Sequence, residues 1–248
     1  RGATLSADTM NIQGVVNASD GGITVRQTSF GRDINIGTET ASALSLTQLE
    51  LDNLLTTGTF SLGNTSSGAI TVNGMVTGTS PSFVFVTSGT SFTQNAGVSL
   101  TGGLSINAPA ITIAAPLSAG AAGIAFTADN LSVSSSVASG GNLDVNTRTP
   151  GRRIDLGVAS FTGSALELTD AQLDNLSTPT RLRFNASGAL NVQGPISPAL
   201  ATTLSLASGD TVSQAAGAII TVPSLAVAAP FGVDLPEHPP VPLALVPT

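Results

Sequence analysis

The sequence predicts an all-β protein built as a solenoid, in which short parallel strands stack turn upon turn around one thin core. Two observations predict this fold. Short runs of alternating apolar and small polar residues recur along the chain, and the whole pattern repeats after roughly 120 residues. Regular strands inside a longer internal repeat are typical of stacked architectures. One short helix is expected in each long repeat.

The strand signal is local. Runs such as "GITVRQ", "AITVNG", "LSINA" and "ITIAA" place β-branched residues or leucine at every second position, which is typical of strands. Gly, Asn, Ser, Asp and Pro lie between the runs, where turns need them. Because hairpin-length pairing signals are missing, we expect a coil of parallel strands. At ~20 residues per turn, about twelve turns would form a rod of roughly 55–60 Å, given a strand spacing of about 4.8 Å.

The composition fits a thin core. Trp, Tyr and Cys are absent, so the core must be built mainly from Val, Ile, Leu and Ala. Outward positions favour Ser, Thr and Asn, which can form hydrogen bonds along a ladder, whereas stacked charges repel. A disordered chain is not expected, because 41% of the residues are hydrophobic and disordered chains are poor in apolar residues.

The long repeat is read directly from the chain. "SALSLTQLELDNL" at residues 42–54 matches "SALELTDAQLDNL" at residues 164–176, and "GRDINIG" at residues 31–37 matches "GRRIDLG" at residues 151–157. We therefore predict a continuous solenoid over residues 1–230, made of two ~120-residue units cut out of phase, with their boundary near residue 150. Residues 231–248 are rich in proline and form an irregular last turn, a strand over the open end of the core, or a flexible tail.

The segment "SLTQLELDNLL" departs from the strand pattern. Thr47 and Glu50 have the spacing of a capping box, and the leucines that follow recur at helical intervals. We predict a short helix at a corner of the coil that covers one turn with its leucines: Leu46, Leu49, Leu51, Leu54 and Leu55. The alternative is a pair of short strands.

The second copy of this segment keeps most of the signal. Thr169 and Gln172 preserve the capping box, Leu173 and Leu176 preserve the apolar positions, and Ala171 takes the place of Leu49. The same helix is therefore expected once in each long repeat.

Charge and composition exclude several functions. The net charge is −7, and the eight positive residues are all arginines without a basic cluster, so nucleic acid is not an expected partner. The absence of cysteine excludes disulfides and thiolate metal sites. The sequence contains no run of 18 apolar residues, so no membrane-spanning helix is predicted. Because the chain starts within repeat-like sequence, without an initiator Met or a signal peptide, we expect it to be a piece of a longer protein.

The repeat also resembles a known family. "GRRIDLG", "GSALELTDAQLDNL" and "TTLSLASGDTVSQAAGAIITVPSLAVAA" are similar to repeats of filamentous-haemagglutinin-like bacterial surface exoproteins, the adhesins of two-partner secretion. The resemblance covers essentially the whole chain. It implies a right-handed parallel β-helix, located outside the cell or on the bacterial cell surface. Nothing here matches the family's N-terminal secretion domain, and the proline-rich tail departs from the repeat.

No catalytic, cofactor-binding or metal-ligating residue is predicted. His238 is the single histidine and lies outside the repeat, so a Ser–His–Asp site cannot be argued. Some polysaccharide-degrading enzymes use parallel β-helices, and Asp52 and Asp174 are the candidate acids for such a reaction. Each stands as one acid beside Asn53 or Asn175, where helix-end capping explains both residue types equally well.

The two arginine-containing turns are the remaining candidate binding sites. Arg32, Arg152 and Arg153 are expected at turns that enter a strand, and the simplest interpretation is a solvated corner with a local ion pair between Arg32 and Asp33. The alternative is a docking patch for an anionic glycan. The glycines of the same motifs are expected at turn positions that need a positive φ.

The sequence therefore favours a non-enzymatic structural segment of an extracellular bacterial adhesin or surface fibre. It would act as a stiff rod that projects or presents weak, multivalent contacts. One alternative is a self-assembling matrix filament whose subunits stack end to end; a second is a β-helix carbohydrate-active enzyme. The expected partners are neighbouring turns or copies of the chain itself, and glycans or proteins of a host or neighbouring cell.

Overall fold

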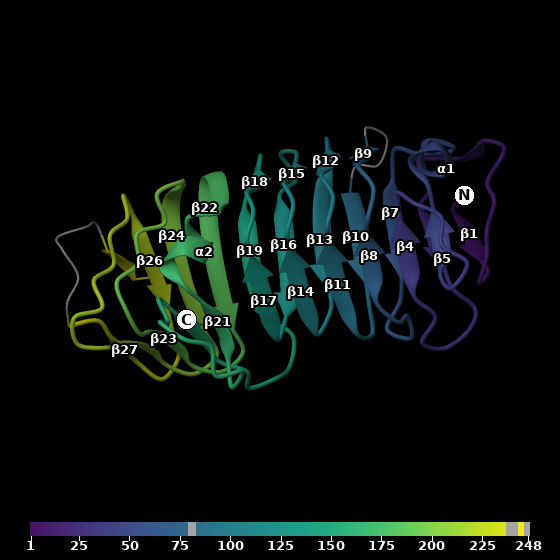
Figure 1. The fold of residues 1–248 in the computed structure, drawn as a ribbon. Helices are drawn as coiled ribbons and strands as arrows, with labels where there is room; N and C mark the ends of the chain where they lie inside the picture. The colour runs from purple at the N-terminus through teal and green to yellow at the C-terminus, as the bar shows by residue number, and fades with distance from the viewer. Residues whose placement is uncertain (79–82, 237–242, 246–248) are drawn as a thin grey trace.

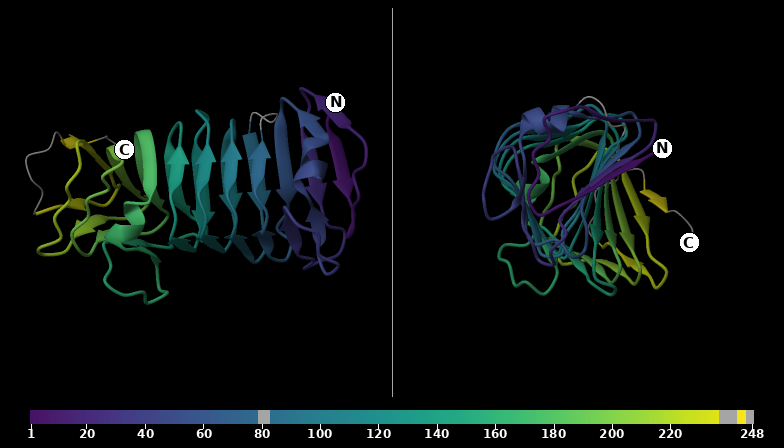
Figure 2. Two further views of the ribbon diagram at one scale, coloured as in Figure 1. Left: turned by 45° about the horizontal axis from the view of Figure 1, so that its top comes forward. Right: turned by 90° about the vertical axis from the view of Figure 1, so that its right-hand side faces the viewer.

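A computed structural model describes residues 1–78, 83–236 and 243–245 and has the predicted architecture, a parallel β-helix. Successive turns lie side by side along a rod, from the purple N-terminal end to the yellow C-terminal end (Figure 1). Seen from its end, the rod is a coil of strands around a common interior (Figure 2, right). Neither helix in the described part of the chain is long and apolar enough to cross a membrane.

The first face of the coil is the longest ladder. All neighbouring strands on it pair in parallel, and it contains eleven strands within the described residues: β1 (Ala3–Ser6), β3 (Ile23–Arg26), β7 (Thr59–Gly63), β10 (Phe83–Thr87), β13 (Gly103–Asn107), β16 (Ile124–Ala128), β19 (Leu143–Thr147), β22 (Leu176–Ala186), β24 (Ala201–Ser208), β26 (Leu225–Ala228) and β28 (Leu243–Leu245).

The second face consists of two consecutive parallel sheets. The first has six strands: β5 (Leu44–Leu46), β4 (Ile34–Ile36), β8 (Ile70–Val72), β11 (Ser91–Gln94), β14 (Ala110–Ile113) and β17 (Asn130–Val133). The second has five strands: β21 (Leu166–Leu168), β20 (Ile154–Leu156), β23 (Leu190–Val192), β25 (Val212–Gln214) and β27 (Val233–Asp234).

The third face is interrupted. A two-stranded sheet joins β2 (Val16–Ser19) to β6 (Leu54–Thr56), and a separate ladder joins β9 (Val76–Gly78), β12 (Val98–Leu100), β15 (Leu117–Ala119) and β18 (Val137–Ser139) to the first residues of β22. Within the described residues, no ladder pairing joins β6 to β9.

The number of turns is smaller than the sequence suggested. Eleven strands on the first face correspond to eleven turns, not twelve, and their ten spacings of about 4.8 Å give a rod of roughly 48 Å. Ordinary turns have the expected length, since Leu104 pairs with Ile124 and Ile124 pairs with Leu143. Two turns are much longer: Ile23 pairs with Phe60, 37 residues later, and Leu143 pairs with Leu182, 39 residues later.

These two long turns explain the long repeat. In each, the chain lays down one strand on the second face and then returns to add another strand beside it. β5 pairs with β4 on the edge opposite β8, and β21 pairs with β20 on the edge opposite β23. A short helix follows each extra strand: α1 (Gln48–Asp52) and α2 (Asp170–Leu173). One long repeat therefore contains five turns.

Both helices begin as the sequence predicts. Thr47 and Glu50 form a complete capping box, as do Thr169 and Gln172, so two amide donors at each helix start are satisfied. The helices then bond to the next turn through side chains. The Gln48 carboxamide donates to the Thr77 carbonyl at 2.8 Å and accepts from the Thr77 amide at 3.0 Å. Gln48 thus takes the place of a ladder strand.

The prediction for the leucines is only partly right. Leu46 and Leu54 are buried but belong to β5 and β6, and Leu49 of the helix is 74% exposed. A helix of five residues makes little more than one turn, so few of its side chains can face the core. Leu51 is the α1 leucine that packs against it, while Ala171, the counterpart of Leu49, is also exposed.

One hydrophobic core runs through the coil. Inward residues of successive turns stack as ladders of like side chains, for example Ile106, Phe126 and Val145, all fully buried. Outward polar residues also stack, as predicted. Asn95 donates to Asn73 at 2.9 Å, and Asn73 donates to Asn35 at 2.7 Å. Non-polar contacts inside and hydrogen bonds outside therefore both run along the axis.

The proline-rich tail contributes to the last turn. β27 pairs with β25, and β28 pairs with β26, so the described parts of residues 231–248 extend two of the faces. Of the three arrangements that the sequence left open, this corresponds to an irregular last turn.

Candidate functional site

The two candidate catalytic acids lie far apart. Asp52 ends α1 and accepts a hydrogen bond from Gln48 at 2.7 Å, while Asp174 caps the C-terminus of α2. β9, β12, β15 and β18 lie between these positions on the third face. The structure therefore does not bring the two carboxylates together, and each is explained by its own helix.

The neighbouring asparagines have a structural role that the sequence did not reveal. The Asn53 side chain donates to the Ile12 carbonyl at 2.9 Å, and Asn175 donates to the Val133 carbonyl at 3.1 Å. Both bonds tie the end of a helix to the preceding turn. The repeated "LDNL" motif is thus accounted for by stacking.

Metal and histidine chemistry find no support in the described residues. His238 lies outside them. Within residues 1–78, 83–236 and 243–245, no group of three or more His, Cys, Asp or Glu side chains is arranged to hold a metal ion.

The arginines of the repeated turn motifs are structural anchors. Arg152 Nη2 donates to the carbonyl oxygens of Asp129, Gly163 and Ala165, at 3.0, 3.0 and 2.8 Å. Arg32 Nη2 does the same in the first copy, with the carbonyls of Asp8, Ala41 and Ala43 at 3.2–3.4 Å. Each arginine thus joins the preceding turn to the returning limb of a long turn.

The predicted ion pair between Arg32 and Asp33 is wrong. Ion pairs in the described part of the chain are Arg153–Asp155, Arg181–Asp144 and Arg183–Asp144. Asp33 instead accepts a hydrogen bond from the Ala69 amide at 2.7 Å. The glycine prediction is confirmed, since the glycines that open and close both motifs have positive φ: Gly31, Gly37, Gly151 and Gly157.

Two buried carboxylates help to close the long turns. Glu50 accepts from the amides of Ile12 and Thr47, each at 2.9 Å, and from the Thr47 hydroxyl at 3.0 Å. Burial by itself would raise the pKa of Glu50, but these hydrogen bonds outweigh burial and hold the pKa below its ordinary value. Glu39 is largely exposed, but partial loss of solvent around its carboxyl group and the charge of Glu50 raise its pKa.

Glu167 has the same function in the second copy, through different donors. Its carboxylate accepts from the Thr162 amide and hydroxyl and from the Gly163 amide. Burial opposes ionisation, but these bonds, with the charge of Arg153, lower the pKa of Glu167. Both carboxylates thus accept hydrogen bonds from backbone amides of the long turns.

Replacing Glu50 with glutamine is expected to lower the free energy of unfolding by about 1–2 kcal/mol at neutral pH. The glutamine would keep one acceptor oxygen, and in the second copy the oxygen of Gln172 accepts from the Thr169 amide in this way. Its NH2 group, however, would face a backbone or hydroxyl donor that the Glu50 carboxylate accepts from. A carboxyl whose pKa is lowered by folding stabilises above its unfolded pKa and loses this contribution as the pH falls. The difference from the parent should therefore shrink below about pH 4. Urea unfolding followed by far-UV circular dichroism measures both effects.

The matched control is Glu39→Gln, which removes a neighbouring exposed carboxyl group and leaves the amide donors to Glu50 in place. This variant should be as stable as the parent, or slightly more stable, at neutral pH. A destabilisation by Glu50→Gln that stays constant down to about pH 3 would contradict the role of the Glu50 charge.

Comparisons with protein-family models, curated proteins and solved structures found no match to this chain. The arguments for function that follow use the residues and geometry described above.

Proposed function

We propose that this chain is a structural segment of an extracellular bacterial adhesin or surface fibre. It acts as a stiff rod that projects, or presents weak contacts along its length. The observation that supports this role best is the single hydrophobic core, which extends from Ile12 in the first turn to Val227 near the last. The ladder of the first face is likewise continuous from β1 to β28.

The outer surface supports the same proposal. Only 9% of the residues are charged, and Asn, Ser and Thr side chains repeat at the spacing of the turns. Regularly repeated polar groups present the same weak contact many times. Such contacts become useful when several are made at once, because the second and later ones are intramolecular.

The alternative, a filament whose subunits stack end to end, is favoured by one specific feature. Among the residues that the structure describes, β1 pairs with β3 on one edge and with no strand on its other edge. An unpaired strand edge is a template for another strand.

Negative-stain electron microscopy over a range of concentrations tests the proposal. Single rods of roughly 48 Å, the length expected from the strand spacing, are the predicted result at every concentration. Fibres that lengthen with concentration would overturn it in favour of the filament. Compact particles without an elongated axis would contradict both.

A variant at the free edge makes the test sharper. The amides of Ala3 and Ala7 donate toward β3, so the Thr4 amide points away from the ladder. Thr4→Pro therefore removes an outward donor and leaves the inner bonds intact. Any fibres should be lost with Thr4→Pro if β1 is the growing edge. Thr24→Pro, the same change inside the ladder of β3, is the control that should damage the fold itself.

Contact by multivalency has its own test. The chain coupled at high density to beads should bind target cells or glycans, whereas the free monomer should bind with far lower apparent affinity. Equal apparent affinity of beads and monomer would indicate a single strong site instead.

A further inference from the structure

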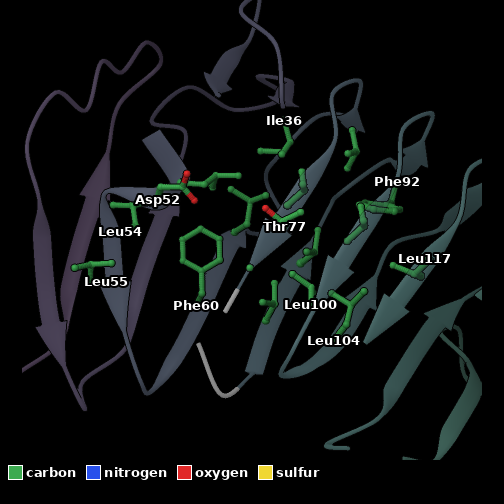
Figure 3. Close-up of a pocket in the computed structure, with 18 residues that line it drawn as sticks. Ile36, Asp52, Leu54, Leu55, Phe60, Thr77, Phe92, Leu100, Leu104 and Leu117 are labelled. Atoms are coloured by element: carbon green, nitrogen blue, oxygen red, sulfur yellow. The ribbon is translucent and has the colours of Figure 1, made fainter. Parts of the chain in front are cut away.

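An internal cavity lies where the third face is interrupted. Its volume is about 260 Å³, and it extends from α1 and the gap between β6 and β9 into the interior of the coil (Figure 3). The aromatic ring of Phe60 and the side chains of Leu100 and Leu104 face this space.

The lining is almost entirely hydrocarbon. Among the described residues around the cavity, Asp52 and Thr77 carry the polar side-chain atoms. Asp52 is exposed on α1, so the cavity reaches the surface beside this carboxylate. An enclosed apolar cavity of about 150 Å³ is known to hold benzene, and this larger cavity, which opens to the surface, has a lining of the same kind.

The second copy of the repeat shows how the same place is closed. Val76 pairs with Val98 in the first copy, and the corresponding Ile196 pairs with Ile220 in the second. The two isoleucines are 1% and 0% exposed, whereas the two valines are only partly buried. Likewise Leu173 is fully buried, and its counterpart Leu51 is half-buried. The first copy therefore lacks one methylene group at each of two facing positions.

We propose that this cavity is a binding site for a neutral, apolar small molecule of the size of a single aromatic ring or a short aliphatic chain. The ligand would fill the cavity and contact the hydrocarbon side chains around it. Burial of apolar surface and dispersion contacts would then stabilise the complex. The Asp52 carboxylate at the opening disfavours an anionic ligand, since it repels negative charge as the ligand enters. This site is independent of the proposed structural role.

The test uses toluene as the probe and benzoate as its charged analogue. Methyl-resolved NMR of the whole chain should show saturable shifts for toluene, confined to cavity residues such as Val76, Val98 and Leu100. Benzoate should give at least tenfold weaker effects, the factor that corresponds to a modest charge repulsion. Absence of saturable toluene shifts up to its solubility limit would overturn the proposal.

The decisive variant is the double substitution Val76→Ile with Val98→Ile, which copies the second repeat. Because the two added methylene groups fill part of the cavity, it should weaken the toluene shifts and raise the melting temperature of the free protein. The matched control, Ile196→Val with Ile220→Val, makes the opposite change far from the cavity and should leave toluene binding at the first copy unchanged. Unaltered toluene binding in the Val76→Ile, Val98→Ile variant would overturn the assignment. If that variant fails to fold, the location of the shifts in the parent protein still decides the question.

Discussion

Replacing Gly157 with alanine is expected to lower the free energy of unfolding by about 3 kcal/mol, from two separate costs. Gly157 has a φ of 71°, a conformation that costs an L-residue about 1–2 kcal/mol. An added Cβ would also stand 2.5 Å from the carbonyl oxygen of Gly194 in the next turn. Backbone cannot move aside as a side chain does, so we expect a further 1–3 kcal/mol from overpacking.

Gly151→Ala provides the control that separates the two costs. Gly151 has a similar φ of 74°, but an added Cβ would meet nothing within 4 Å. This variant should therefore lose only about 1–2 kcal/mol. Urea unfolding followed by far-UV circular dichroism gives both values, since the chain has no tryptophan or tyrosine for fluorescence. Equal losses in the two variants would show that the close approach of Gly157 to Gly194 carries no cost.

The glycine pair also shows what a repeat pattern can and cannot predict. The motifs "GRDINIG" and "GRRIDLG" predicted positive φ at both ends, and all four glycines have it. The contact with the following turn was not predictable, because it joins residues that are 37 positions apart. In both copies a second glycine, Gly74 or Gly194, lies at the contact. The recurrence of this second glycine in both copies was the one feature of the sequence that pointed to a close approach.

Strands were predictable for a related reason. Alternation at i and i+2 depends only on neighbouring residues, and the inward residues it selected, such as Ile34 and Ile36, are indeed buried. That β5 returns to pair beside β4, and β21 beside β20, was not predicted, because alternation does not show with which neighbour a strand pairs. The predicted number of turns was slightly too high because it assumed ~20 residues in every turn, whereas two turns contain 37 and 39 residues.

The cavity was not predictable, because the differences in side-chain size between the two copies do not change the alternating strand pattern. Val76 and Ile196 are equally good strand residues, and so are Val98 and Ile220. Only their positions on facing strands show that two missing methylene groups fall in the same place. A position-by-position alignment of the two copies would not have shown this, because it places Ala218 opposite Val98, and the pairing of Ile220 with Ile196 is seen only in the structure.

The arginine anchors lead to the second large effect. Arg152→Met is expected to lower the free energy of unfolding by about 3 kcal/mol, because hydrogen bonds to charged groups contribute about 1.5–3 kcal/mol each and are not fully additive. Methionine keeps an apolar stem of similar length but leaves the carbonyls of Asp129, Gly163 and Ala165 without their shared donor. Amide hydrogen exchange should accelerate most in residues 158–168, the returning limb of the long turn.

Arg26→Met is the matched control, since Arg26 is exposed and its side chain makes one hydrogen bond, to Ser6 at 3.1 Å. Its cost should stay within about 0.5 kcal/mol, as for most surface substitutions. Arg152→Lys should fall between the two, because an ammonium group is a more compact donor than a guanidinium fork. If Arg152→Met matched Arg26→Met in stability but weakened binding to an anionic polysaccharide such as heparin, the arginines would belong to a ligand site. The three carbonyls around Arg152, repeated around Arg32, argue that charge in this solenoid is used to hold turns together.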